Sequence, residues 1–356
     1  MIGTTAQLIV HWISSKVKVN NGYVLGPIIE SIQVNQSIKH VVITGGCGYI
    51  GSHIAKAMQR HGGYRVTVID RVSRRHTLKY CDTFLIADYD SEETYIRLQN
   101  DPPDAIVHCA GSLLVGESVE NPALYYDNNV AKTARFLDQV RQLPHLPVIV
   151  FSSSAAVYGN PASVPITESS PIQPMNPYGH TKAMVEQMLK DFDRAYGLKS
   201  VCLRYFNACG ADIDIGQEAG ASHIIARLLD AKLANNTFTL NGTDFNTADG
   251  TCIRDYVHVN DLATAHITAI DYLLEVGESN QFNLGTNEGI SNQQIINQVL
   301  ETVGHIDIQT GPRRAGDPDI LIANATKAWE VLAWETEYSA LETIVDSAWK
   351  WYQRRE

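Results

Sequence analysis

The stretch His40-Val-Val-Ile-Thr-Gly-Gly-Cys-Gly-Tyr-Ile-Gly51 decides the fold that this sequence predicts. Its first five residues form a short, largely β-branched run, which is typical of a buried strand. Glycines follow at positions 45, 48 and 51, and a helical pattern begins at Ser52. With those glycines the turn can be tight, and its backbone can approach a pyrophosphate at the N-terminus of the helix. We therefore expect a strand, a nucleotide-binding turn and a helix.

The next predicted strand, Arg65–Asp70, supports a dinucleotide site because it ends in an acid. A carboxylate at this point can hydrogen-bond a ribose diol, which favours NAD over NADP. A basic group follows at once, formed by Arg71, Arg74, Arg75 and His76. Arginines suit a 2′-phosphate, but with Asp70 beside them we interpret this group as a solvated loop.

Four further short apolar runs continue a pattern of strands that alternate with helices. They are Phe84–Asp88, Ala105–Gly111, Pro147–Ser154 and Ser200–Phe206, and a long helix is predicted over Pro122–Leu143. This alternation predicts an α/β fold with a doubly wound parallel sheet, the Rossmann-like arrangement. Ligands of such sheets lie beyond the carboxyl ends of the strands, so the hydroxyls of Ser152–Ser154 fall where chemistry is expected.

The stretch Tyr178-Gly-His-Thr-Lys182 carries the clearest catalytic pattern. It follows Asn176-Pro177 and opens a helix, so the tyrosine and the lysine lie four residues apart on one helix face. A free tyrosine titrates near pH ~10, and a lysine ammonium held close to it would lower that pKa and make the tyrosine a base. Alone, such a pattern is more often a packed tyrosine and a solvated lysine.

Size and composition describe an ordinary globular protein of 356 residues, 44% hydrophobic and 19% charged, which is long enough for two lobes. The net charge of −11 argues against a surface for nucleic acid or for an anionic membrane. Six cysteines without a Cys-x-x-Cys pair indicate reduced thiols in a cytoplasmic protein, with no disulfide framework and no metal site. No apolar run reaches the length of a transmembrane helix.

We expect three parts along the chain. Residues 1–38 form an N-terminal extension of unknown role, residues 39–206 form an NAD-binding domain with a returning segment near 251–285, and residues 207–356 are mainly a smaller, mixed α/β substrate lobe. In residues 207–356 the sequence predicts helices over Ser222–Leu233, Leu262–Leu274, Ser291–Val303 and Tyr338–Tyr352, and a short strand over Phe238–Leu240. Stretches rich in Gly, Asn, Asp and Thr between them are typical of a lobe that covers a substrate.

Three further motifs complete an ordered set: Leu203-Arg-Tyr-Phe-Asn207, Arg254-Asp-Tyr-Val-His-Val259 and Arg313-Arg-Ala-Gly-Asp317. Together with the glycine turn, Asp70, Ser154 and the Tyr-x-x-x-Lys pattern, they make the chain resemble the extended short-chain dehydrogenase/reductase family. The resemblance begins at about residue 39 and continues to the end of the chain. Within that family the chain is most similar to the enzymes that invert C4 of a UDP-hexose and interconvert UDP-glucose and UDP-galactose.

The resemblance implies a tightly held NAD that is reduced and reoxidised in every turnover. Tyr178 would take the proton of the sugar 4-hydroxyl, Lys182 would lower the tyrosine pKa and bond the nicotinamide ribose, and Ser154 would bond the same sugar oxygen. It also implies a homodimer, formed through the helices near Pro122–Leu143 and the helix that bears Tyr178. The residues that we expect to contact NAD are Gly45, Gly48, Tyr49, Ile50, Gly51, Asp70, Asp88, Tyr89, Cys109, Ala110, Gly111, Asn128, Ser152, Tyr178, Lys182, Tyr205 and Phe206.

Other reactions of the same family can be weighed on individual residues. Sugar-nucleotide 4,6-dehydratases carry an Asp-Glu pair directly after the hydroxyl residue, and this chain has Ala155-Ala156 there. Neither alanine can transfer a proton, which argues against dehydration. Two alternatives stay open: epimerisation of another UDP-sugar (an N-acetylhexosamine, a pentose or a uronate), and a non-catalytic NAD(H)-binding regulator.

The substrate contacts depart most from the family pattern. A family lysine near the cofactor is replaced by Leu113, and the aromatic residue that packs against uracil is replaced by Asn241. Leu321 stands where some relatives have a bulky tyrosine, and this smaller side chain would leave room for a 2-acetamido group. Arg254 and Arg314 match positions near the diphosphate and uridine, where a guanidinium fork suits an anion, although surface ion pairs are the plain alternative. The residues that we expect to contact the UDP-sugar are Ser154, Tyr178, Asn207, His223, Asn241, Arg254, Arg314, Asp317 and Leu321.

Overall fold

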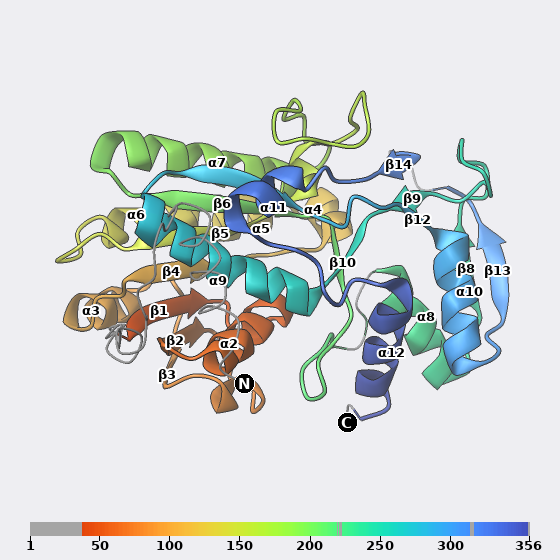
Figure 1. Cartoon of the computed structure of the whole chain (residues 1–356), viewed down its shortest axis with the longest axis horizontal. Helices are drawn as coiled ribbons and strands as arrows, with labels where there is room; N and C mark the ends of the chain where they lie inside the picture. The colour runs from red at the N-terminus through yellow and green to blue at the C-terminus, as the bar shows by residue number, and fades with distance from the viewer. Residues whose placement is uncertain (1–37, 219, 221–222, 314–316, 355–356) are drawn as a thin grey trace, which may run out of the picture. The chain divides into compact units, whose positions relative to one another are not determined.

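Strand β1 (Lys39–Thr44) lies inside a seven-stranded sheet, with the glycine turn at its carboxyl end (Figure 1). The structure is a computed structural model, and it describes residues 38–218, 220, 223–313 and 317–354. The N-terminal extension predicted for residues 1–38 therefore lies outside the described residues, apart from Ile38.

The sheet confirms the predicted fold class. Its strands, in spatial order, are β11 (Asn280–Leu284), β6 (Ser200–Tyr205), β5 (Val148–Ser154), β4 (Ala105–His108), β1, β2 (Tyr64–Asp70) and β3 (Thr83–Ile86). Every neighbouring pair is parallel. The order reverses between β1 and β4, which is the switch point where doubly wound sheets bind their ligands.

Helices cover both faces of this sheet, and the side chains of β1 alternate between the two cores. Val41 and Ile43 pack with helices α2 (Tyr49–His61), α9 (Val259–Val276) and α11 (Thr326–Leu332). Val42 packs on the opposite face with helices α3 (Glu92–Asn100), α6 (Lys132–Val140) and α7 (Pro177–Tyr196). The strands are apolar on both faces because both faces are buried.

The helix predicted over Pro122–Leu143 is interrupted. It consists of α5 (Pro122–Tyr125), a π-helical turn (Tyr126–Ala131) and α6, and a separate helix α4 (Val115–Glu120) precedes it. The wider turn carries Asn128 and Asn129, whose side chains are buried and hydrogen-bonded to Ser112. A π-helical turn often marks a functional position, and this one borders the cavity described below.

The smaller lobe is built from helices α8 (Ile224–Ala234), α10 (Asn292–Val303) and α12 (Leu341–Tyr352) around an apolar core of their own. Its strands are short: β8 (Phe238–Asn241) with β13 (Ile308–Gly311), β9 (Ile253–Arg254) between β12 (Ile290–Ser291) and β14 (Ile320–Leu321), and β7 (Asn207–Cys209) with β10 (Tyr256–His258). Helix α10 begins with a capping box, in which Ser291 and Gln294 exchange hydrogen bonds.

Three findings bear on the predicted site types. No helix in the described part of the chain is both long and apolar enough to cross a membrane. All six cysteines are free thiols. The described residues contain no group of three His, Cys, Asp or Glu side chains that could hold a metal ion.

Candidate active site

A cavity of about 640 Å³ opens at the carboxyl ends of the central strands. It borders the turn between β1 and α2, where Gly45 has a φ of +71°. A Cβ atom at Gly45 would lie 2.7 Å from Ala110 Cα, and one at Gly51 would lie 2.4 Å from Gly45 O. Side chains are therefore excluded at both positions, so the backbone of the turn itself borders the cavity and can face a pyrophosphate.

Every residue that the sequence analysis placed against NAD lines this one cavity. Asp70 is held by the glycine turn and by its own loop: its two carboxylate oxygens accept from the backbone N–H groups of Cys47 (2.9 Å) and Val72 (3.1 Å). Asp88 pairs with Lys132 through Oδ2, whereas its Oδ1 is buried and, among the described residues, has no hydrogen-bond partner. A buried acceptor without a donor fits the exocyclic amine of an adenine, so the residues present suit a dinucleotide.

The basic group after Asp70 is only partly the solvated loop that the sequence indicated. Arg71 and Arg74 both line the cavity, and Arg74 forms an ion pair with Glu218 from the other lobe. Leu113, at the position of the family lysine, lines the same cavity and is 66% exposed. Arg71 and Arg74 therefore border this cavity as cations, whereas an apolar side chain borders it at Leu113.

Tyr178 and Lys182 lie in the first two turns of α7, and the local sequence explains why the helix starts there. Asn176 caps it by accepting from the Gly179 N–H at 2.8 Å, and Pro177 occupies the first position. Lys182 Nζ lies 5.7 Å from the centre of the Tyr178 ring and donates to the Ser152 carbonyl oxygen at 2.8 Å. Ser154, at the end of β5, is a hydrogen-bond partner of Tyr178. The three residues therefore meet in one part of the cavity.

The pKa of Tyr178 shifts in the direction opposite to the one that the sequence predicted. Burial raises the pKa of Tyr178, and the hydrogen bond with Ser154 opposes that rise. We expected Lys182 to lower the pKa of Tyr178, but its ammonium is bonded to the Ser152 carbonyl and the effect of burial dominates. Burial lowers the pKa of Lys182 itself to about 8. The lysine is therefore still mostly protonated at neutral pH.

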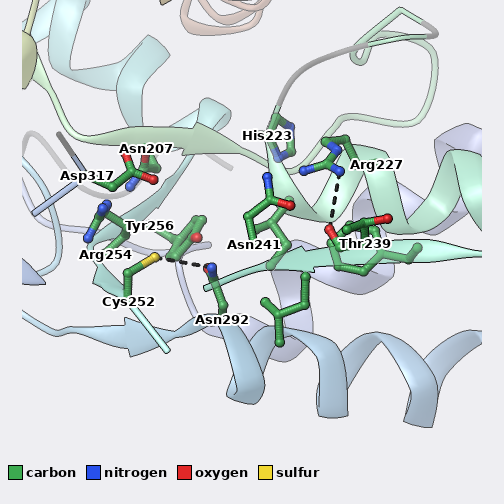
Figure 2. A pocket seen from close by; sticks show the side chains of 13 residues that line it. Asn207, His223, Arg227, Thr239, Asn241, Cys252, Arg254, Tyr256, Asn292 and Asp317 are labelled. Atoms are coloured by element: carbon green, nitrogen blue, oxygen red, sulfur yellow. Dashed lines mark hydrogen bonds between the residues drawn. The ribbon is translucent and has the colours of Figure 1, made fainter. Parts of the chain in front are cut away.

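A second, smaller pocket of about 160 Å³ lies in the adjoining lobe and shares Asn207 and His223 with the large cavity. Figure 2 shows Arg254, Asn241 and Asp317 among the side chains that line it. Arg254 donates to two backbone carbonyl oxygens, those of Ile253 at 2.8 Å and Asp319 at 3.4 Å. Most of the residues that line the pocket are polar, and they include one arginine on β9 and a second, Arg227, on α8.

Two predicted substrate residues are not part of either cavity as described. Arg314 lies outside the described residues. Leu321 on β14 lines neither cavity; it packs with Phe206 and Ala323 in a small apolar cluster. Arg313, the neighbour of Arg314, is turned toward protein groups, with an ion pair to Asp319 at 2.9 Å and the Phe245 ring 4.0 Å away.

Sequence reasoning missed several residues that line these cavities. Arg227, Thr239, Cys252, Tyr256 and Asn292 border the smaller pocket, and Ser112, Gln217 and Glu218 border the larger one. Arg227 and Asn292 sit inside or at the start of ordinary helical patterns, where nothing in the sequence separates a lining side chain from a surface one. A signal was available for Tyr256, which lies inside the recognised motif Arg254–Val259, and for Cys252, which lies two residues before that motif.

Comparison with known proteins places these features in a family. Residues 41–285 match the epimerase family model, described as the NAD dependent epimerase/dehydratase family. The chain is 42% identical over 321 residues to a UDP-glucose 4-epimerase of Halalkalibacterium halodurans, covering 88% of this chain and 95% of that protein.

Solved structures agree with the sequence comparison. The crystal structure of UDP-glucose 4-epimerase from Brucella ovis in complex with NAD has a TM-score of 0.83 and 40% identity, covering 87% of this chain and 97% of that one. A UDP-glucose 4-epimerase from Stenotrophomonas maltophila, with bound NAD and formylated UDP-arabinopyranose, has a TM-score of 0.84 and 32% identity, covering 88% and 98%.

Proposed function

Because the chain belongs to the NAD dependent epimerase/dehydratase family, we propose that it catalyses the NAD-dependent 4-epimerisation of a UDP-hexose, interconverting UDP-glucose and UDP-galactose. The observation that carries this proposal is the meeting of Ser154, Tyr178 and Lys182 at one end of the dinucleotide cavity. NAD, when bound, takes a hydride from C4 of the sugar and returns it within the same turnover.

The residues of the large cavity would hold the dinucleotide along its length. The glycine turn and the N-terminus of α2 would hold the pyrophosphate, Asp70 would bond the adenosine ribose, and Asp88 would bond the adenine. Lys182 would bond the nicotinamide ribose while it keeps its bond to the Ser152 carbonyl oxygen. An ammonium has three donors, so both bonds can exist together.

Tyr178 would remove the proton of the sugar 4-hydroxyl, with Ser154 bonded to the same oxygen. Tyr178 accepts this proton as a phenolate and becomes a phenol, and the nearby ammonium of Lys182 favours the phenolate from which the step starts, since opposite charges nearby favour the ionised tyrosine. Reduction on the opposite face of the resulting 4-keto sugar then inverts C4, and Tyr178 gives the proton back. The next residues, Ala155 and Ala156, lie in the short 3-10 turn Ala155–Val157 and supply no second acid or base, so the 4-keto sugar is re-reduced without loss of water.

The smaller pocket would receive the UDP group. Arg254 and Arg227 are the described cations there, and a guanidinium fork suits a diphosphate. Asn207, at the junction of the two cavities, would lie between the sugar and the nucleotide. Leu321 lines neither cavity, so a site for a 2-acetamido group is not included in this proposal.

We also propose a homodimer and a reducing cellular compartment. Helices α4, α5 and α7 contact one another and expose apolar side chains, among them Val119, Leu124 and Met184. Such a surface suits a second copy of the same helices in a symmetric interface. The six free thiols suit a compartment such as the cytoplasm.

The function is tested by offering the purified protein UDP-glucose, UDP-galactose, their N-acetyl forms, a UDP-pentose and a UDP-uronate, and by identifying each product by NMR. We expect inversion at C4 with UDP-glucose and UDP-galactose. Denaturation should release NAD into the supernatant. Release of NADP, or turnover of a pentose or uronate alone, would contradict the proposal; bound NAD without any turnover would favour a regulator.

A further inference from the structure

We propose that His266 is a positioning residue for hydride transfer, acting on the nicotinamide end of the cofactor cavity through Tyr205 and Ser152. The inference rests on the proposed function. His266 lies on α9, on the face of the sheet opposite α7, and its side chain is completely buried. It lines neither cavity, and no residue pattern in the sequence points to it.

The hydrogen bonds of His266 determine where its ring carries a proton. Nδ1 lies 2.8 Å from the Leu262 carbonyl oxygen, which can only accept, so Nδ1 carries the hydrogen. Burial lowers the pKa of His266 to about 4, so the ring is neutral at pH 7. Its second nitrogen, Nε2, is then an acceptor.

Two neighbours compete for the single hydroxyl proton of Tyr205. Its oxygen lies 2.5 Å from His266 Nε2 and 2.8 Å from Ser152 Oγ. A neutral His266 offers Nε2 only as an acceptor, whereas the serine hydroxyl can donate as well as accept. With His266 in place, Tyr205 therefore donates to Nε2, and the Ser152 hydroxyl is free to donate to the Tyr205 oxygen.

This row of polar groups ends beside the catalytic lysine. Ser152 Oγ lies 3.0 Å from Cys109 Sγ, and the backbone carbonyl oxygen of Ser152 accepts from Lys182 Nζ at 2.8 Å. Tyr205, Ser152 and Cys109 all line the cavity at this end. The direction of these hydrogen bonds determines whether each side chain presents a proton or a lone pair to a bound nicotinamide.

The tip of β5 is thus held from both sides. Ser152 is bonded to Tyr205 on one face, and on the other face Ser153 Oγ donates to Glu186 Oε1 at 2.5 Å. Without the His266 acceptor, the Tyr205 hydroxyl would donate to Ser152 instead. The direction of the hydrogen bond between Tyr205 and Ser152 would then be reversed, while the bond between Ser153 and Glu186 stays in place. The expected consequence is slower hydride transfer with little change in substrate affinity.

The test compares His266→Leu with His266→Gln, because a glutamine side chain can place an amide oxygen near the position of Nε2. We expect His266→Leu to lower kcat about tenfold, which corresponds to the loss of one hydrogen bond, and to change KM less than about twofold. His266→Gln should recover most of the activity. The rate at which substrate reduces the bound NAD, followed at 340 nm in a single turnover, should fall in parallel with kcat. Tyr205→Phe supplies the second background, since it removes the hydroxyl through which His266 acts.

In the Tyr205→Phe background, His266→Leu should cause no further loss, because the two residues act as one unit. Independent losses that multiply in the double variant would overturn the inference, as would a His266→Leu enzyme with unchanged kcat. If His266→Leu fails to fold, the His266→Gln variant decides the question: a kcat as low as that of Tyr205→Phe would overturn the inference. Failure of the proposed function is seen separately, as no turnover of a UDP-hexose by the unaltered holoenzyme.

Discussion

In the cofactor cavity the chemically important groups are held by backbone groups or by a buried ion pair, whereas in the substrate pocket they are held by short, partly exposed elements. Lys182 is bonded to a backbone carbonyl, Asp70 to two backbone N–H groups, and Ser153 to the buried Glu186–Arg204 pair. Arg254, by contrast, lies on a strand of two residues and bonds to backbone carbonyls beside it.

This difference indicates a division of labour. Hydride and proton transfer need a fixed geometry, because a small misplacement of the reacting atoms costs rate. Recognition of the nucleotide needs a few well-placed cations and hydrogen bonds, and their side chains can adapt when the ligand arrives. Changes in the large cavity should therefore lower kcat, and changes in the small pocket should raise KM.

The largest effect is expected for Tyr178→Phe, which removes the proton acceptor and little else. We expect kcat to fall by roughly 10³-fold with NAD still bound and KM little changed, since general acid–base groups contribute about 10²- to 10⁴-fold. Tyr196→Phe is the matched control, because Tyr196 lies on the same helix and is 47% exposed. Full activity in Tyr178→Phe would rule out the mechanism.

The buried ion pair between Arg204 and Glu186, next to the cofactor cavity, can be compared with an ion pair of the other lobe. Arg204→Met should lower the free energy of unfolding by about 3–5 kcal/mol, because it leaves Glu186 as an uncompensated buried charge. Arg313→Met, which breaks a pair that is about one-third exposed, should cost about 1 kcal/mol or less. Urea unfolding measures both. Equal losses would contradict the contrast between the two regions, and a double variant with Glu186→Leu should recover part of the stability.

A change in the substrate pocket should act on affinity instead. We expect Arg254→Gln to raise KM for UDP-galactose roughly 10- to 100-fold, the value of one or two hydrogen bonds to a charged group, while kcat falls much less. Arg135→Gln, which removes an exposed arginine paired with Asp90, is the control. A loss confined to kcat would mean that Arg254 supports the reaction and not the binding.

The smallest effect is the pH dependence, which we place in the cofactor cavity. The pKa of Lys182 is lowered to about 8, so its ammonium is present below that pH and is lost as the pH rises through it. We expect kcat to fall by at most tenfold per pH unit above pH 8, the limit for loss of one proton. The described cations of the substrate pocket are arginines, so KM should stay flat between pH 7 and 9. A profile in which KM rises and kcat stays constant would contradict this assignment.

The local part of the structure could be predicted from the sequence. The β-branched run and the spaced glycines predicted β1, the turn and α2, and the alternation of strands and helices predicted the parallel sheet. The helix predicted over Ser291–Val303 matches α10, and the four-residue spacing placed Tyr178 and Lys182 on one face of α7. These features depend on short-range periodicity and backbone geometry, which a single sequence expresses directly.

The partners of the polar groups were decided only by the tertiary structure. Lys182 binds the Ser152 carbonyl, Ser153 turns away to Glu186, and Leu321 packs beside Phe206 instead of lining a cavity. Each of these contacts joins residues that are far apart in the chain or on opposite faces of a strand. The sequence by itself determined the turn that receives a dinucleotide and the helix that carries the tyrosine. Burial and long-range packing decided the protonation of these groups, and they also brought His266 into hydrogen-bond contact with Tyr205. Desolvation and hydrogen-bond direction exist only once the sheet is assembled.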